Sequence, residues 1–154
     1  MPVRLLQFVL RLLDGLSHLL PGRGRRAPAH IATGRAGEEA AYFHLRRQGY
    51  VIVARNQRSR RSRGEIDLIG WDDGVLCFIE VKTRTTRDVK PAEAAVDEPK
   101  RRELSIMARD YLRRSAGAAQ QTPVPYRFDI VSVYYEAEKS IPQITLFKNA
   151  FSMT

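Results

Sequence analysis

Two apolar runs joined by an Asp-Gly pair constrain the fold of this chain more than any other feature. They lie between residues 64 and 84, with Asp73-Gly74 between them. This pair is typical of a two-residue hairpin turn in which both central residues have positive φ. The sequence therefore predicts two antiparallel strands in a fixed register, because a slip by one residue would turn every side chain to the other face.

The predicted register gathers charged side chains at the open end of the hairpin. Asp67 then faces Glu80, and Glu65 faces Lys82. Because side chains alternate between the two faces of a strand, all four charges lie on one face of the sheet.

Both faces of the hairpin are otherwise apolar, which predicts that it is buried on both sides. The charged face also carries Ile69, Trp71, Leu76 and Phe78. The opposite face carries Ile66, Leu68, Val75, Cys77, Ile79 and Val81.

Two facing carboxylates need a cation or a shared proton. At about 5 Å and an effective dielectric near 20 they repel by roughly 3 kcal/mol. Lys82 is one cation that relieves this repulsion, and a divalent metal is another. Ligands that offer only oxygen favour Mg²⁺ or Mn²⁺. The hairpin thus has the layout of a metal-dependent nuclease site. An ordinary Glu65–Lys82 pair, with Asp67 ending a strand, remains the alternative.

Composition limits the class of protein and its partners. A chain of 154 residues is the size of one domain, and its net charge of +9 with a pI near 10.2 indicates a polyanionic partner, either nucleic acid or an anionic membrane surface. The single Cys77 excludes a disulfide framework and suits a reducing cytoplasm. The three histidines are scattered, which argues against zinc and covalent acyl chemistry.

The sequence divides into three parts. Residues 1–20 predict an amphipathic helical extension with one polar stripe, residues 21–32 a basic linker, and residues 33–154 the main domain. Arg11 and Asp14 would each cost about 2.5 to 3.5 kcal/mol at the centre of a bilayer, which disfavours a transmembrane span. The extension could lie on its own domain, on a partner subunit or on a membrane surface.

A helix is predicted from Thr33, as N-cap, to Gln48, with Gly49 as its stop. Its apolar stripe unexpectedly includes Glu38, next to Ala41, Tyr42 and Leu45. A buried carboxylate is costly without a partner. Glu38 either joins the metal cluster or is a first-turn glutamate favoured by the helix dipole.

Arginines surround the hairpin, and we interpret them as phosphate contacts. After a short strand at residues 50–56, the loop at 57–63 leads directly into the acidic hairpin. Contacts to phosphates give affinity without sequence choice. The candidate nucleic-acid residues are Arg55, Arg58, Arg60, Arg61, Arg63, Arg84, Lys100 and Arg101.

The remaining elements complete the expected order. Asp97 caps a helix with Pro99 in its first turn and Gly117 at its end. The core stripe of that helix is Leu104, Met107, Ala108 and Tyr111. Strands are predicted at 126–135 and 144–147.

The order and the motifs together resemble a known family. Matching stretches are Gly34-Arg-Ala-Gly-Glu-Glu-Ala40, Gly49-Tyr50, Arg55-Asn56, Gly64-Glu-Ile-Asp-Leu-Ile69, Phe78-Ile-Glu-Val-Lys-Thr-Arg84, Lys100 with Arg101 and Arg102, Arg127-Phe-Asp129 and Asn149-Ala-Phe151. They resemble the bacterial YraN-like family, within the restriction-endonuclease-like, or PD-(D/E)XK, nuclease superfamily related to archaeal Holliday-junction resolvases. The resemblance implies an α/β fold with an αβββαβ core, a mixed sheet flanked by helices.

The resemblance also implies a function. Glu38, Asp67 and Glu80 would be the metal positions for Mg²⁺ or Mn²⁺, Lys82 the catalytic lysine and Glu65 a weaker candidate. The expected activity is a DNA endonuclease, acting on branched DNA as a homodimer, in which metal-activated water attacks the phosphodiester. The alternative is a non-catalytic nucleic-acid-binding or scaffold protein that keeps the carboxylates for folding.

Overall fold

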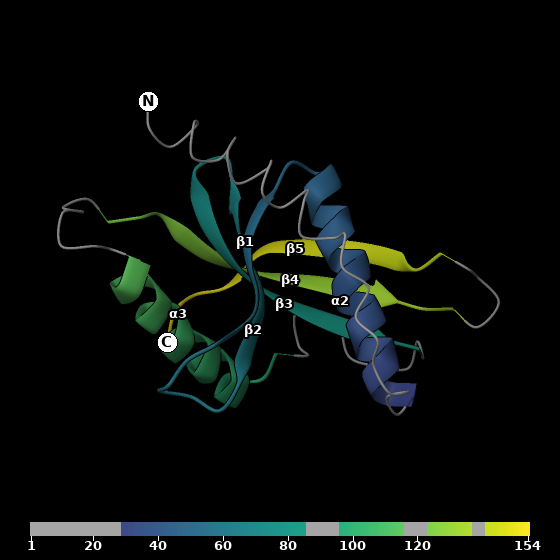
Figure 1. Cartoon of the computed structure of the whole chain (residues 1–154), viewed down its shortest axis with the longest axis horizontal. Coiled ribbons are helices and arrows are strands. Elements are labelled where there is room, and N and C mark those ends of the chain that lie inside the picture. The colour runs from purple at the N-terminus through teal and green to yellow at the C-terminus, as the bar shows by residue number, and fades with distance from the viewer. Residues whose placement is uncertain (1–28, 86–95, 116–122, 137–140) are drawn as a thin grey trace, which may run out of the picture.

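The computed structural model describes residues 29–85, 96–115, 123–136 and 141–154 (Figure 1). Within them the chain forms two helices and a five-stranded sheet. The predicted helix at 1–20 lies outside the described residues. The elements are α2 (Ala29–Arg47), β1 (Val51–Arg58), β2 (Glu65–Asp72), β3 (Val75–Arg84), α3 (Glu98–Ser115), β4 (Tyr126–Tyr134) and β5 (Gln143–Phe151).

The sheet is mixed, in agreement with the prediction. Its strands follow chain order, β1-β2-β3-β4-β5. The β3–β4 pair is parallel and the other three pairs are antiparallel. A parallel pair needs a long crossover connection, and α3 lies in it. Figure 1 shows the two helices flanking the sheet.

The hairpin turn forms as predicted. Asp73 has a φ of 46° and Gly74 a φ of 86°, so both central residues adopt the left-handed region. The strands pair from Leu68 with Ile79 to Asp72 with Val75, which is the expected register. The Asp-Gly pair therefore sets the alignment of the strands that carry the candidate site.

Two apolar clusters cover the two faces of the sheet. One packs against α3 and contains Ile66, Ile69, Leu76, Phe78, Phe128 and Ile130. The other packs against α2 and contains Leu68, Cys77, Ile79, Val131 and Val133. The face assignment is confirmed except for Ile66, which was expected beside Leu68. Ile66 and Ile69 share a cluster, so the alternation of side chains is interrupted between them.

The predicted start of α2 was wrong, and its predicted end was close. The helix begins at Ala29 rather than after Thr33, since residues 29–32 contain no glycine or proline to halt it. At the other end, Gly49 has a φ of 95° and donates its N–H to the Arg46 carbonyl at 3.1 Å. The Tyr50 N–H reaches the Leu45 carbonyl at 3.1 Å, which completes a Schellman cap and turns the chain into β1.

Gly37 allows α2 to approach the end of β3 closely. A Cβ atom at this position would lie 1.8 Å from the Thr83 hydroxyl oxygen. No Cβ atom tolerates such a contact, so the helix would have to move away from the strand. Gly37 thus fixes the position of the neighbouring Glu38 relative to the hairpin.

We expect Gly37→Ala to destabilise the fold by about 2 to 3 kcal/mol, because the new methyl group overpacks the α2–β3 contact. Gly34→Ala is the matched control, since a Cβ there meets nothing within 4 Å. In the helix interior, alanine at residue 34 should instead stabilise by about 1 kcal/mol. Urea unfolding measures both changes. Equal effects of the two substitutions would contradict the close approach.

The remaining elements lie close to their predicted places. Asp97 caps α3, accepting from the Lys100 N–H at 3.0 Å through its side chain. Leu104, Met107 and Ala108 are buried, and Tyr111 packs beside them. β1 and β5 extend beyond their predicted ends. The predicted stop at Gly117 lies outside the described residues.

Candidate metal and nucleic-acid site

Asp67 lies where β2 and β3 separate. The pairing of the hairpin ends at Leu68 with Ile79. Beyond this point the Asp67 carboxylate accepts a hydrogen bond from the Val81 backbone N–H at 2.7 Å. A side chain therefore takes the place of a backbone partner, and Asp67 points across the gap between the strands instead of facing Glu80 as an ordinary cross-strand residue.

Asp67 is also the most perturbed carboxylate of this region. Burial, Glu80 and Glu38 raise its pKa to about 7, while the Val81 N–H and Lys100 oppose the shift. Two further carboxylates are thus close enough to act on Asp67. The three predicted acidic positions, from α2, β2 and β3, share one electrostatic environment.

Glu80 is buried and carries an oxygen without a hydrogen bond. Its side chain is 5% exposed, and the Lys82 ammonium lies 2.9 Å from Oε1. Oε2 has no hydrogen-bond partner, although the Lys100 ammonium lies 3.4 Å away as an ion pair. Lys82 was predicted beside this carboxylate. Lys100 was predicted to contact nucleic acid, and the structure pairs it with Glu80.

Glu38 reaches the site from α2. It is half-buried, next to the fully buried Ala41, Tyr42 and Leu45. The Asn56 side chain donates a hydrogen bond to Glu38 Oε2 at 2.9 Å. Asn56 has a φ of 48°, a conformation that asparagine tolerates better than most residues. Sequence reasoning gave Asn56 no role, although it belongs to the matched Arg55-Asn56 stretch.

Glu65 does not face Lys82. It forms an ion pair with Arg58, whose Nε lies 3.1 Å from Glu65 Oε2. The two residues are partners in the β1–β2 register. Because β2 leaves β3 before Glu65, this weaker candidate pairs with the neighbouring strand and not with the lysine.

In the described part of the chain, no three His, Cys, Asp or Glu side chains are arranged to hold a metal ion. A physical reason is visible in the partners of each carboxylate. Asn56 holds Glu38, the Val81 N–H holds Asp67, and two lysines surround Glu80. The donor chemistry fits a hard divalent cation, because all three residues offer carboxylate oxygens and one buried oxygen lacks a hydrogen bond.

Four of the predicted phosphate contacts are exposed around one loop. Arg58, Arg60, Arg61 and Arg63 lie at or near the segment 59–64. Two serines tie this segment to α3. Ser59 donates to Asp110 at 2.6 Å, and Ser62 donates to Glu103 at 2.8 Å. The loop therefore holds its arginines at a fixed place next to the hairpin.

The other predicted basic residues differ in their surroundings. Arg55 is exposed, with its guanidinium 4.7 Å from the centre of the Tyr42 ring. Arg84 is half-buried at the end of β3. Arg101 donates to the Val96 carbonyl at 2.9 Å and lies 5.5 Å from the Phe151 ring. Arg101 thus helps to pack α3.

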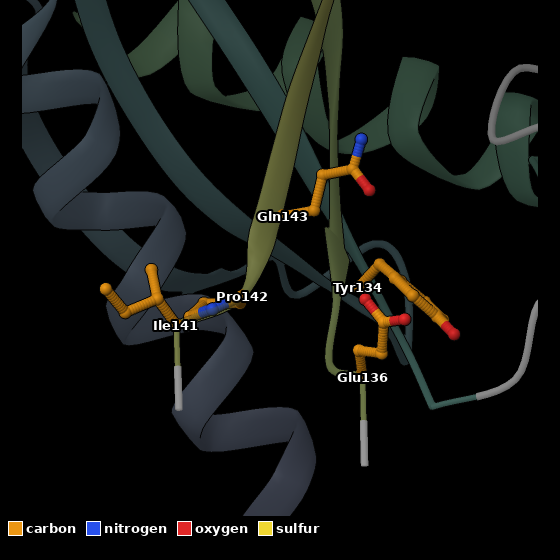
Figure 2. A pocket seen from close by; sticks show the side chains of 5 residues that line it. All are labelled: Tyr134, Glu136, Ile141, Pro142 and Gln143. Atoms are coloured by element: carbon orange, nitrogen blue, oxygen red, sulfur yellow. The ribbon is translucent and has the colours of Figure 1, made fainter. Parts of the chain in front are cut away.

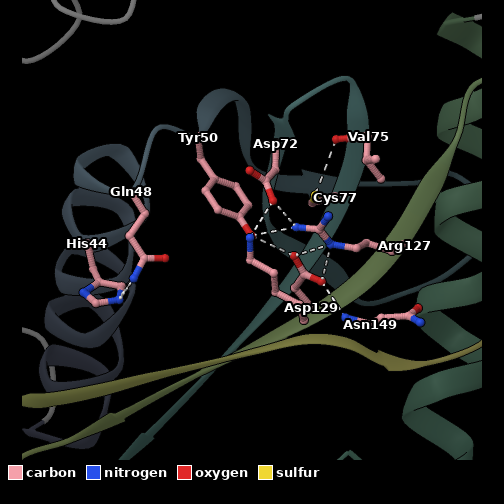
Figure 3. Close-up of polar contacts among 10 residues, drawn as sticks. His44, Gln48, Tyr50, Asp72, Val75, Cys77, Arg127, Asp129 and Asn149 are labelled. Atoms are coloured by element: carbon pink, nitrogen blue, oxygen red, sulfur yellow. Dashed lines mark hydrogen bonds and ion pairs between the residues drawn. The ribbon is translucent and has the colours of Figure 1, made fainter.

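Sequence reasoning missed a buried ion network beside the Schellman cap (Figure 3). Asp129 is fully buried and accepts from Arg127 at 2.8 Å, from Tyr50 at 3.2 Å and from the Asn149 N–H at 2.9 Å. Arg127 also donates to Asp72 at 2.6 Å. Burial opposes ionisation of Asp72, but hydrogen bonds from Lys148 and Arg127 lower its pKa.

This network is structural, because its groups satisfy one another. Asp129 belongs to the matched Arg127-Phe-Asp129 stretch, and the sequence names no partner for it. Cys77 lies nearby, and burial raises the pKa of its thiol to about 12, so it stays a neutral core residue. The predicted core role of Cys77 is confirmed.

Two cavities lie near the start of β5, away from the carboxylates. One of about 350 Å³ is lined by Tyr134, Glu136, Ile141, Pro142 and Gln143 (Figure 2). A second of about 340 Å³ lies between β5 and α2. Neither is lined by a predicted site residue. Among the described helices, none has the length and apolar character needed to cross a bilayer.

Comparisons with known proteins find relatives over most of the chain. The model of a family described as "Uncharacterised protein family UPF0102" matches residues 37–133. A UPF0102 protein of Koribacter versatilis is 53% identical over 148 residues, covering 96% of this chain and 95% of the relative. One from Solibacter usitatus is 47% identical over 129 residues, covering 84% and 91%. One from Porphyromonas gingivalis is 41% identical over 124 residues, covering 80% and 87%. The matched region 37–133 contains Glu38, Asp67, Glu80, Lys82 and Lys100.

Proposed function

This chain belongs to the uncharacterised protein family UPF0102, and we propose that it is a divalent-metal-dependent DNA endonuclease on a restriction-endonuclease-like core. The observation that carries the proposal is the group of Glu38, Asp67 and Glu80, in which burial and the two neighbouring carboxylates raise the pKa of Asp67 to about 7. A cation bound among three such carboxylates would stabilise the folded protein, because it would relieve their mutual repulsion. Perturbed carboxylates of this kind often mark functional sites.

The order of the elements supports the same proposal. A helix, three antiparallel strands, a crossover helix and a parallel strand follow one another, as in an αβββαβ core. Glu38 comes from the helix, Asp67 from the second strand, and Glu80 and Lys82 from the third. The analogy of this order with a restriction-endonuclease-like core supports DNA as the substrate.

Each residue has a distinct part in the proposed reaction. A divalent cation held by Glu38, Asp67 and Glu80 would activate water and neutralise charge on the phosphate. The Lys82 ammonium lies 2.9 Å from Glu80 Oε1, and the Lys82 side chain is 29% exposed. From there the ammonium is placed to stabilise negative charge that develops on a phosphate oxygen.

The arginines around segment 59–64 supply the contacts to the DNA backbone. They are exposed, and the loop that carries them leads directly into β2 and its Asp67. Such contacts bind any sequence, so selectivity would come from the shape of the DNA. We propose branched DNA as the substrate and a homodimer as the active form, since cutting two strands calls for two sites.

A second candidate is a nucleic-acid-binding protein without catalysis. The observation in its favour is that protein donors engage all three carboxylates, with no three of the described acidic, histidine or cysteine side chains arranged for a metal. This candidate predicts DNA binding without cleavage and without stabilisation by metal.

A panel of DNA structures tests the proposal with the full chain. Linear, nicked, flapped and four-way substrates are incubated with Mg²⁺, with Mn²⁺ or with a chelator, and products are separated on denaturing gels. We expect cleavage only with metal. We expect binding, measured with Ca²⁺ in place of Mg²⁺, to weaken about a hundredfold between 50 and 200 mM salt if about four phosphates are contacted.

Binding without cleavage across this panel would favour the second candidate. Absence of both binding and cleavage would contradict both. In the binding assay, a protein heated past its unfolding temperature serves as the control for nonspecific attraction by a net charge of +9.

A further inference from the structure

Lys100 lies between two carboxylates at the start of α3. Its ammonium is 3.4 Å from Glu80 Oε2 and 3.7 Å from Glu103 Oε2. The Lys100 side chain is 26% exposed and that of Glu80 is 5% exposed, so solvent screens this contact only in part. Lys100 also lowers the pKa of Asp67, which places its charge near that carboxylate. An ammonium in this position faces the acidic group directly.

The Glu80 oxygen that Lys100 faces is the buried one without a hydrogen bond. Lys82 occupies the other oxygen, at 2.9 Å. At 3.4 Å the contact with Lys100 is an ion pair and not a hydrogen bond. Glu80 Oε2 therefore accepts no hydrogen bond, and the Lys100 ammonium beside it contributes only an electrostatic contact.

Helix geometry sets the reach of Lys100. The Asp97 cap fixes the first turn of α3, because Asp97 accepts from the backbone N–H of Lys100 itself. The side chain thus leaves a fixed backbone position one turn from the cap. Glu103, three residues further on the same helix, offers it a second carboxylate.

We propose that Lys100 is a tethered cation that neutralises Glu80 in the metal-free protein, and that it moves to Glu103 when a divalent cation takes Glu80 Oε2. The inference rests on the proposed metal site and assigns Lys100 to it. Lys100 then competes with the metal and lowers its affinity. The pairing of Lys100 with Glu80 in the metal-free protein would account for the absence, among the described residues, of three carboxylates arranged to hold a metal ion.

Glu103 connects this exchange to the arginine loop. It accepts a hydrogen bond from Ser62 at 2.8 Å. A Cβ at Gly64 would lie 2.5 Å from the Glu103 carboxyl carbon, so the glycine lets the loop pass close to it. Ser62 and Gly64 hold Glu103 beside the loop, where it can keep the released ammonium paired.

The test is the affinity for Mn²⁺ alone, measured by calorimetry on the full chain without DNA. Lys100→Met removes the charge and keeps a flexible apolar side chain. We expect its dissociation constant for Mn²⁺ to fall about tenfold, because one close positive charge no longer opposes the metal. Lys100→Arg keeps the charge and should bind Mn²⁺ no more tightly than the wild type.

Arg102→Met is the matched control for net charge on α3. Arg102 pairs with the exposed Glu98 at 3.2 Å and its side chain is 70% exposed. This variant should bind Mn²⁺ within about twofold of the wild type, since exposed charges are well screened. A gain as large as that of Lys100→Met would overturn the proposal.

The possible failures are distinct. If the wild type binds Mn²⁺ and Lys100→Met binds it equally or more weakly, the tethered-cation role is wrong while the metal site stands. If neither protein binds Mn²⁺ and both remain folded by circular dichroism, the metal site itself is wrong and the inference falls with it. Loss of fold in Lys100→Met, with tighter binding by the folded Lys100→Gln variant, would still support the role.

Discussion

Asp67→Asn is expected to lower metal-dependent DNA cleavage about a thousandfold while the protein stays folded. The asparagine oxygen can still accept the 2.7 Å hydrogen bond from the Val81 N–H, so the backbone keeps its local geometry. The negative charge is lost, and with it a ligand for the proposed metal. A thousandfold loss corresponds to about 4 kcal/mol, which is within the range of charge stabilisation that a bound metal supplies.

The same substitution should stabilise the metal-free protein at high pH. Because the folded state raises the pKa of Asp67 to about 7, it holds the proton more tightly than the unfolded state does. The wild type therefore loses stability from this group as pH rises from about 4 through 7. The amide that replaces the carboxyl group does not ionise. The free energy of unfolding of Asp67→Asn should therefore rise relative to that of the wild type across this pH range, by up to about 4 kcal/mol above pH 7.

Gel assays with Mg²⁺ and urea unfolding at pH 5 and pH 8 measure the two effects. Asp73→Asn is the matched control, since this exposed turn residue has positive φ and Asn-Gly suits the same turn. It should keep cleavage and show no comparable pH-dependent gain. Full activity of Asp67→Asn would refute its role, and a loss of stability at pH 8 would contradict the electrostatic account.

Asp129→Ala is expected to cost about 3 to 5 kcal/mol of folding free energy. Asp129 is fully buried, and its removal leaves Arg127, the Tyr50 hydroxyl and the Asn149 N–H without their shared acceptor. Removing one partner of a buried ion pair costs far more folding free energy than removing one partner of an exposed pair, because the remaining charge stays buried without compensation. Urea unfolding at pH 7 measures the loss.

Lys148→Ala is the control from the rim of the same network. Lys148 contacts Asp72 at 2.7 Å, but its side chain is 51% exposed. Such pairs contribute about 1 kcal/mol or less. Similar losses for Asp129→Ala and Lys148→Ala would show that burial does not decide the strength of this network.

Local sequence was sufficient for the hairpin and its surroundings. The Asp73-Gly74 pair determines the turn, and alternation assigned every apolar hairpin side chain except Ile66 to its correct face. The YraN-like resemblance is confirmed at the level of the UPF0102 family. Membership of the nuclease superfamily and the metal chemistry remain proposals.

Long-range pairs could not be predicted in the same way. Arg127 reaches Tyr50 across 77 positions and Asn56 reaches Glu38 across 18, and no periodicity encodes such contacts. The direction of Asp67 was missed because regular pairing was assumed to continue past Leu68. Lys100 looked like one of several surface cations on α3, since only the fold reveals that its helix begins opposite Glu80.

The parallel β3–β4 pair also determines the order in which the chain can fold. β1, β2 and β3 are neighbours in sequence and can pair through short loop closures, whereas Glu80 meets Ile130 only after some 50 residues have been looped. Lys100 lies inside that loop. Closing the short hairpin loop costs little chain entropy. Closing the longer loops that bring Lys100 and β4 to β3 costs more. The topology therefore makes the pairing of Lys100 with Glu80 a later event of folding than closure of the hairpin, whereas Lys82, on the same strand as Glu80, needs no loop to reach it.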